Sequence, residues 1–137
     1  HEGPEALVGK DGVVSIPYSA SFCQTDEYSL GLLTLKKRGN PLNRADWLKS
    51  GKPVFEKKPS AKAYGPGHNA FFKSPDGKEN WIIYHATTNP SDGIGDKRNI
   101  RMQRFTFEGG VPEFGEPVDA DERIAKPSAE YQPENVF

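Results

Sequence analysis

The chain has 137 residues, a formal net charge of −1 and 34% hydrophobic residues, which suits a globular protein with a small core. Its charges alternate in sign without long blocks, so the sequence indicates neither a nucleic-acid-binding stripe nor a basic membrane-surface helix. No apolar run approaches the roughly 18 residues of a membrane span. Cys23 is the single cysteine, which excludes an intrachain disulfide. We therefore expect partners other than nucleic acid or a membrane.

Predicted strands follow one another along most of the chain. They are rich in β-branched and aromatic residues and are bounded by Gly, Pro, Asn and Asp; in chain order they span residues 6–8, 13–20, 28–35, 71–73, 81–86 and 100–107. Gly12 and Gly77 complete two tight turns of the kind that joins hairpin strands. Residues 41–50 could form one short helical turn around Trp47, but no segment has a sustained helical period. The pattern predicts an all-β fold.

An internal repeat organises these strands. Gly3 opens one unit and Gly67 opens the next, 64 residues later, and each glycine leads through an apolar segment and a turn into a strand. The Pro-Val pair that starts at Pro53 recurs at Pro117 with the same spacing. Units of several strands that cannot bury their own faces are typical of propeller blades.

Two such units are fewer than a closed propeller needs. We therefore predict a partial propeller in which residues 1–118 form about two four-stranded antiparallel blades. Residues 119–137 are charged and contain prolines, and we expect an extended tail or a ring-closing segment there. The faces that missing blades would cover predict a companion chain or self-association.

Glu2 and His68 are the first candidates for chemistry. Each lies beside the glycine that opens a unit, at the entry to the first strand. In a propeller this innermost strand faces the central channel, so a carboxyl group and an imidazole would converge from neighbouring blades. Taken singly, a glutamate is more often a solvated surface group and a histidine more often a structural hydrogen-bonding group. Their matching positions in the repeat favour a functional interpretation.

Further candidates lie in and after the long loop 87–97. Arg98 and Arg101 follow it, and a guanidinium could bind a sugar hydroxyl or a carboxylate, although exposed arginines also serve solubility. Asp92 and Asp96 could bind an ion or stabilise turns, and turn stabilisation is the commoner role.

Several aromatic residues could stack on a sugar ring, among them Phe22 and Tyr28. Most large aromatics fill the wedge between twisted sheets instead, and we assign Trp47 and Trp81 to the core. His85 lies in an apolar strand and could belong either to the core or to the channel.

Several motifs together resemble a known family. They are His1-Glu2-Gly3-Pro4, Tyr18-Ser19-Ala20-Ser21, Leu30 to Thr34, Trp47 to Phe55, Tyr64-Gly65-Pro66-Gly67-His68-Asn69, Ser74 to Gly77, Trp81 to Ala86 and Arg101-Met102-Gln103. In this order they resemble the C-terminal half of glycoside hydrolase family 43, nearly to Val118. The resemblance implies a five-bladed β-propeller with α-L-arabinofuranosidase, β-xylosidase or arabinanase activity and inversion of configuration.

The resemblance also implies roles for individual residues. Glu2 would be the general acid, and His68 would match an axial histidine that helps to hold a water-coordinated ion, often Ca²⁺. Arg98 would match an arginine near the sugar pocket. Independently of the resemblance, we expect the aromatic ring of Phe22 to bind substrate. Gln24 stands where relatives often have an aromatic residue.

The family's base and its third carboxylate belong to blades that precede this chain, so we expect little or no turnover from the chain alone. The expected substrate is an arabinan or arabinoxylan, and we expect a secreted protein. Two alternatives stay open. One is a β-xylosidase with the same mechanism, and the other is a non-catalytic fragment that binds sugar or completes a ring structurally.

Overall fold

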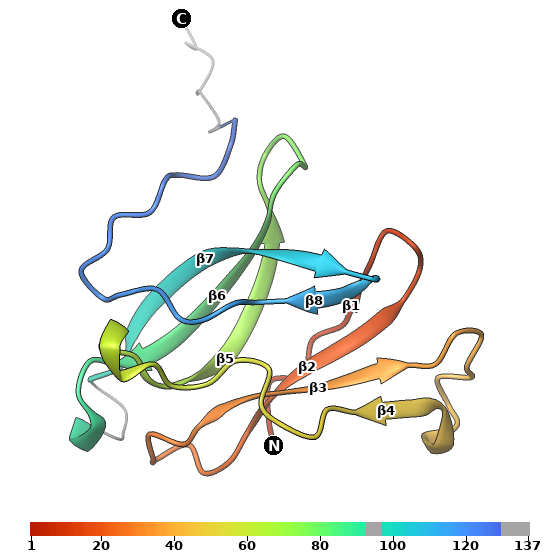
Figure 1. Cartoon of the computed structure of the whole chain (residues 1–137), viewed down its shortest axis with the longest axis horizontal. Helices are drawn as coiled ribbons and strands as arrows, with labels where there is room; N and C mark the ends of the chain where they lie inside the picture. Colours follow the sequence, from red (N-terminus) through yellow and green to blue (C-terminus); the bar gives the residue numbers. More distant parts are fainter. Residues whose placement is uncertain (93–96, 130–137) are drawn as a thin grey trace, which may run out of the picture.

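The computed structural model describes residues 1–92 and 97–129, which form two four-stranded antiparallel sheets (Figure 1). The strands of the first sheet are β1 (Leu7–Val8), β2 (Val14–Ala20), β3 (Ser29–Leu35) and β4 (Trp47–Lys49), and those of the second are β5 (Tyr64–Lys73), β6 (Asn80–Thr87), β7 (Asn99–Glu108) and β8 (Val111–Glu113). Each sheet holds its strands in chain order. The predicted all-β fold and its two four-stranded units are confirmed.

Within residues 1–92 and 97–129 the structure also contains the short 3-10 helices η1 (Arg44–Asp46), η2 (Pro59–Ala61) and η3 (Pro90–Asp92). Helix η1 confirms the helical turn predicted within residues 41–50, and the side chain of Asn43 caps it by accepting a hydrogen bond from the Ala45 amide. In the described part of the chain, no helix has the length and apolar character to cross a membrane.

The sequence prediction missed the outer strands β4 and β8 and the first seven of the ten residues of β5. Strands β4 and β8 have only three residues each, which is too short for an alternating pattern to stand out. Strand β5 begins at Tyr64, well before the predicted start at residue 71, because the register shifts on both sides of Gly67 let the chain pair with β6 through a glycine- and proline-rich stretch.

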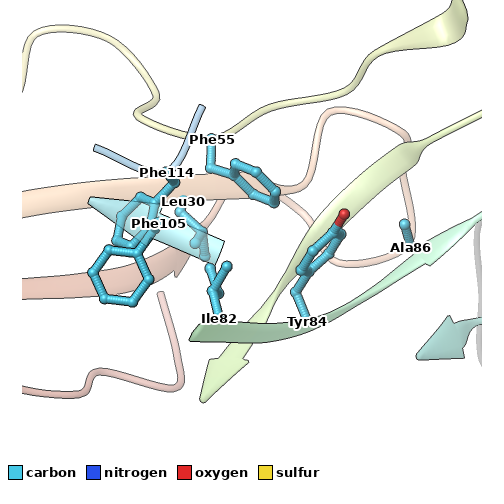
Figure 2. Packing of buried hydrophobic residues seen from close by; sticks show 7 residues of the cluster. All are labelled: Leu30, Phe55, Ile82, Tyr84, Ala86, Phe105 and Phe114. Carbon is cyan, nitrogen blue, oxygen red and sulfur yellow. The ribbon is translucent and has the colours of Figure 1, made fainter. Parts of the chain in front are cut away.

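The hydrophobic core lies between the two sheets (Figure 2). It collects buried side chains from both of them, namely Leu30, Phe55, Ile82, Tyr84, Ala86, Phe105 and Phe114. Phe55 meets the Tyr84 ring edge-on with centroids 4.8 Å apart, which joins the segment after β4 to the second sheet. The two units therefore share one core.

The two tryptophans assigned to the core have different environments. Trp81 is 1% exposed and stacks with Phe72, as predicted. The prediction for Trp47 was wrong: this residue is only half-buried, and its indole N–H donates to the Pro41 carbonyl at 3.0 Å. It lies on the short edge strand β4, where its side chain packs against a local turn.

The hairpin turns at one end of the sheets touch through glycine backbones. A Cβ atom on Gly9, in the β1–β2 turn, would lie 2.4 Å from the carbonyl oxygen of Gly110, in the β7–β8 turn. Real Cβ atoms do not approach that closely, so a side chain at Gly9 would push the two sheets apart. The contact between the two turns therefore lets the sheets lie close together at the edge of the shared core.

Gln103 on β7 fixes the segment that follows β8. Its amide nitrogen donates to the carbonyl oxygens of Phe114 at 3.0 Å and Glu116 at 2.9 Å. Its amide oxygen accepts from the Tyr84 hydroxyl at 2.9 Å and from the Val118 amide at 3.0 Å. One buried side chain therefore makes four hydrogen bonds, and the Val118 amide also donates to the Tyr84 hydroxyl at 3.2 Å, so these groups form a network.

Arg101, also on β7, has a structural role. Its side chain is buried and donates to the carbonyl oxygens of Ala61, Lys62 and Val118 and to the side chain of Asn99. The guanidinium therefore joins η2 to the segment after β8. This use of its donors contradicts the view of Arg101 as an exposed sugar-binding group.

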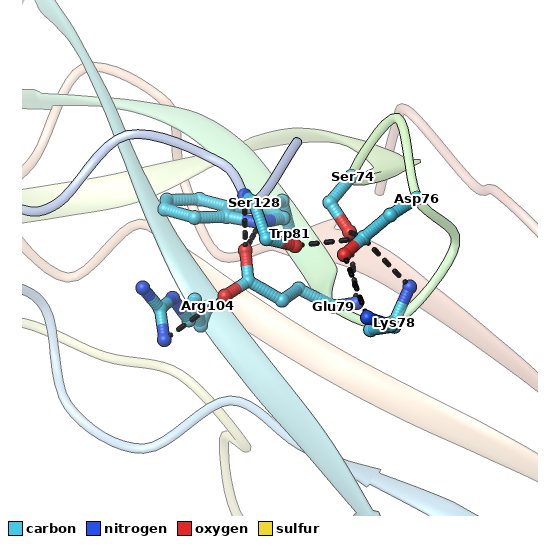
Figure 3. Close-up of polar contacts among 7 residues, drawn as sticks. All are labelled: Ser74, Asp76, Lys78, Glu79, Trp81, Arg104 and Ser128. Atoms are coloured by element: carbon cyan, nitrogen blue, oxygen red, sulfur yellow. Dashed lines mark hydrogen bonds and ion pairs between the residues drawn. The ribbon is translucent and has the colours of Figure 1, made fainter. Parts of the chain in front are cut away.

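The described part of the C-terminal segment folds back onto the second sheet (Figure 3). Ser128 donates from its amide to Glu79 Oε2 at 2.9 Å and from its hydroxyl to Asp76 Oδ1 at 2.7 Å. Ser74 also donates to Asp76, and these hydrogen bonds hold the pKa of the Asp76 carboxyl below its usual range. The prediction of an extended tail or a ring-closing segment over 119–137 stays a prediction, and residues 130–137 lie outside the described residues.

Replacing Gln103 with leucine tests the buried amide network. The change removes four hydrogen bonds and leaves buried partners unpaired, so we expect the free energy of unfolding to fall by about 2–4 kcal/mol. Urea unfolding followed by circular dichroism measures this change. The same substitution at the exposed Gln24 is the matched control, and equal effects at both positions would contradict the network's role.

Candidate functional site

Glu2 is held against the inner part of the first sheet by its backbone. Its amide donates to the Ser19 carbonyl at 3.0 Å, and the Ser19 amide donates to the Glu2 carbonyl at 2.8 Å. The next residue, Gly3, has a φ of 57°, a conformation that glycine adopts without a steric penalty. The exposed carboxyl group of Glu2 is therefore attached to a fixed backbone position on β2.

His68 lies beside this position, on the innermost strand of the second sheet. Its amide donates to the Ser19 hydroxyl at 2.7 Å, and its imidazole lies against Gly3, where an added Cβ would be 3.8 Å from the ring. The φ of His68 is 52° at the irregular part of β5. Left-handed backbone is uncommon for a residue with a side chain and is found preferentially at functional sites. The structure brings Glu2 and His68 together from the two units.

Tyr28 joins this cluster, and the sequence analysis did not connect it with Glu2. Its hydroxyl donates to Glu2 Oε1 at 2.6 Å. This hydrogen bond is the main cause that lowers the pKa of Glu2; partial desolvation opposes it, and the positive potential of His68 and Arg98 assists it. Burial, followed by the contact with Glu2, raises the pKa of Tyr28 to about 12. Glu2 is therefore ionised and Tyr28 protonated at neutral pH.

His85 belongs to the same cluster, and whether it faces a channel stays a prediction. Its ring stacks on Tyr28 with centroids 5.6 Å apart and planes at 5°, and it lies 6.3 Å from the His68 ring. Within the described residues, both of its ring nitrogens are buried without a hydrogen-bond partner. Burial is the main cause that lowers the pKa of His85 to about 4.

Arg98 connects the second sheet to the loop 21–27. Its guanidinium donates to the Cys23 carbonyl at 2.6 Å and lies over the Tyr28 ring at 5.9 Å from the centroid. Both contacts hold the loop that carries Phe22. The Phe22 side chain is 61% exposed, so it is accessible to a ligand.

The loop that precedes Arg98 is only partly described. Asp92 accepts from Asn89 Nδ2 and from Lys97 Nζ, each at 2.9 Å, which is the turn-stabilising role. Asp96 lies outside the described residues.

A calcium ion is not accounted for by this chain's own groups. Ca²⁺ prefers six to eight oxygen ligands, whereas the groups gathered here are the His68 and His85 imidazoles and one carboxyl group that a tyrosine already binds. Among the described residues, no group of three or more His, Cys, Asp or Glu side chains could hold a metal ion. These side chains do not form a calcium site by themselves, and a mainly water-coordinated ion beside His68 stays a prediction through which we derive no chemical step.

Comparison with known proteins places this cluster in a family context. The family model described as glycosyl hydrolases family 43 matches residues 1–112. The chain belongs to glycosyl hydrolase family 43. The matched part contains Glu2, His68 and the other residues of the cluster.

Individual relatives are also similar to this chain in sequence or in structure. An extracellular exo-α-(1→5)-L-arabinofuranosidase from Streptomyces avermitilis is 40% identical over 124 residues, which are 86% of this chain and 25% of that protein. An α-L-arabinofuranosidase 43 from Humicola insolens is 37% identical with the same coverage of both chains. The crystal structure of an α-L-arabinofuranosidase from Lactobacillus brevis superposes with a TM-score of 0.78 at 34% identity, over 89% of this chain and 38% of that one. The chain thus spans about a quarter of the length of the curated relatives.

Replacing His85 with phenylalanine tests the electrostatic state of the cluster. The pKa of His85 is 6.5 in the unfolded chain and about 4 in the folded chain. Between these pH values the unfolded chain therefore binds more protons than the folded chain. The free energy of unfolding should therefore decrease as the pH falls through this window. His85→Phe should remove about 1–2 kcal/mol of that decrease, because partial solvation reduces the full effect.

Chemical unfolding at pH 7 and at pH 4 measures the difference, with His1→Phe at an exposed position as the matched control. An unchanged pH dependence in His85→Phe would contradict the buried, neutral state of this histidine.

Proposed function

We propose that this chain is the C-terminal part of an inverting glycosidase that removes α-L-arabinofuranosyl residues from a plant cell-wall polysaccharide. The two sheets would be neighbouring blades of a five-bladed propeller, and Glu2 would act as the general acid. Membership of family 43 and the names of the relatives support this proposal. The name of the Streptomyces relative also supports a secreted protein.

The observation that carries the proposal is the fixed position of Glu2. Its backbone pairs with β2, its carboxyl group accepts from Tyr28, and the His68 imidazole of the second unit lies beside it. A solvated surface glutamate needs none of these contacts. A general acid needs them, because its proton must reach one particular oxygen of the substrate.

Inverting hydrolysis requires a second carboxyl group about 6.5–9.5 Å from the acid, with a water molecule between them and the sugar. Among the described residues, the groups that shift the pKa of Glu2 include no carboxylate. We infer that the base is supplied by blades that precede this part of the protein. A nearby carboxylate would also raise the pKa of Glu2 by repulsion, which would favour the protonated form that the acid requires.

The first sheet has an apolar surface on which such a segment could pack. A cavity of about 340 Å³ opens next to Glu2, and it is lined by His1, Glu2, Pro4, Ile16, Tyr18, Leu33 and Lys49. Apolar surface beside a candidate catalytic group is typical of a face that another part of the protein covers. We infer that the preceding blade of the ring packs here.

Phe22 and Arg98 would shape the sugar site. The exposed Phe22 ring offers an apolar face for the carbon-bound hydrogens of a furanose. Arg98 would position that ring by holding the loop through the Cys23 carbonyl. Direct contact of Arg98 with a sugar hydroxyl would use the guanidinium donors that remain.

Replacing Glu2 with glutamine tests the acid role. The chain would be assayed with an aryl α-L-arabinofuranoside and an aryl β-xyloside, alone and with a companion fragment that supplies the N-terminal blades. We expect turnover only in the complemented protein, and a decrease of about 10²–10⁴-fold in Glu2→Gln, because the amide cannot donate the proton of an acid. Glu113→Gln on the exposed outer strand is the matched control.

Unaltered activity of complemented Glu2→Gln would rule out the acid role. Preference for the xyloside would replace the arabinofuranosidase proposal with a β-xylosidase of the same mechanism. Sugar binding without turnover in the complemented protein would favour a non-catalytic role.

A further inference from the structure

Tyr28 is buried and also makes a specific hydrogen bond to Glu2. It lies immediately before β3 in the first sheet, is 1% exposed, and directs its hydroxyl to Glu2 Oε1 at 2.6 Å. A hydroxyl-to-carboxylate hydrogen bond of this length is charge-assisted and strong. A buried tyrosine in the first unit thus binds one oxygen of the candidate acid.

The second sheet leaves the Tyr28 ring little freedom to move. A Cβ on Gly67 would lie 2.3 Å from Tyr28 Cε1, so the ring rests directly on the backbone of β5. His85 stacks on the ring with nearly parallel planes, and the Arg98 guanidinium lies 5.9 Å from its centroid. Strands β5 and β6 and the residue before β7 therefore fix the direction of the hydroxyl.

We propose that Tyr28 is a positioning residue that binds Glu2 Oε1 and thereby assigns the transferable proton to Glu2 Oε2; this inference rests on the proposed acid role of Glu2. A carboxylic acid has one carbonyl oxygen and one hydroxyl oxygen. Because the Tyr28 O–H donates, the oxygen that it meets is the acceptor, and the acid proton resides on the other oxygen. The proton-bearing oxygen is then the one that faces the leaving group.

The same contact stabilises Glu2 after the proton has left. A water forms a bond to the anomeric carbon and gives its proton to the base while the glycosidic C–O bond breaks. The electron pair of that bond passes to the leaving oxygen, which takes the proton from Oε2, and Glu2 becomes a carboxylate. The Tyr28 O–H bond to Oε1 strengthens as this negative charge develops. Tyr28 keeps its own proton throughout, because burial and the neighbouring carboxyl group raise its pKa to about 12.

A positioning role and a packing role predict different kinetics for Tyr28→Phe. Aryl arabinofuranosides with leaving groups of different acidity would be assayed with the complemented protein. We expect kcat/KM to fall about tenfold for a phenyl leaving group and to change little for a dinitrophenyl group, which leaves without a proton. We also expect the alkaline limb of the kcat/KM profile to move to higher pH, because loss of the hydrogen bond raises the pKa of Glu2.

A titration of the chain by itself gives a readout that does not depend on turnover. The side-chain carboxyl carbon of Glu2, labelled with ¹³C, should titrate at higher pH in Tyr28→Phe than in the unaltered chain. Tyr84→Phe, which removes another buried tyrosine hydroxyl within the core, should leave the Glu2 titration unchanged. Gly67→Ala retains the hydroxyl but displaces the ring, and it should reproduce the Tyr28→Phe titration if Tyr28→Phe does not fold.

An equal loss of kcat/KM with both leaving groups, together with an unshifted Glu2 titration, would overturn the positioning role. Parallel assays of Glu2→Gln separate this failure from that of the proposed function. Activity retained in Glu2→Gln would refute the acid role itself. Activity lost in Glu2→Gln, with leaving-group independence in Tyr28→Phe, would refute only the inference about Tyr28.

Discussion

The site depends on the hydrogen bonds that Ser19 makes to both sheets. Its backbone pairs with Glu2 in the first sheet, and its hydroxyl accepts the amide of His68 in the second. Ser19 is fully buried, so these bonds are made in a region where an unpaired polar group would be costly. One serine thereby fixes the distance between the two units at the point where the carboxyl group and the imidazole lie. The hydrophobic core between the sheets keeps the first and the second sheet in contact.

The groups around Glu2 favour its ionised form. The groups around Glu2 that shift its pKa most strongly favour the carboxylate, with Tyr28 first and His68 and Arg98 in the same direction. A general acid at neutral pH requires the opposite shift. Under the proposed acid role, these contacts would stabilise Glu2 after proton transfer. The proposal assigns the groups that keep Glu2 protonated before transfer to carboxylates of the preceding blades.

The strand and turn patterns and the 64-residue internal repeat predicted much of the fold, because each can be read from a few neighbouring residues. The common spacing of Pro53 and Pro117 reflects two units of equal length, and the convergence of Glu2 and His68 followed from that spacing. Trp47 was misplaced because an edge strand of three residues carries no periodic signal. The bond between Tyr28 and Glu2 was missed because it joins residues 26 positions apart. The one available signal was Gly67, whose missing side chain makes room for the Tyr28 ring.

The most direct test of this account is the distance from the Glu2 carboxyl group to the nearest carboxylate of the preceding blades in a crystal structure of the complete protein. The account predicts a carboxylate about 6.5–9.5 Å away across the mouth of the ring, the separation of an inverting pair. A structure in which no carboxylate faces Glu2 at this separation would contradict the assignment of this residue as the acid.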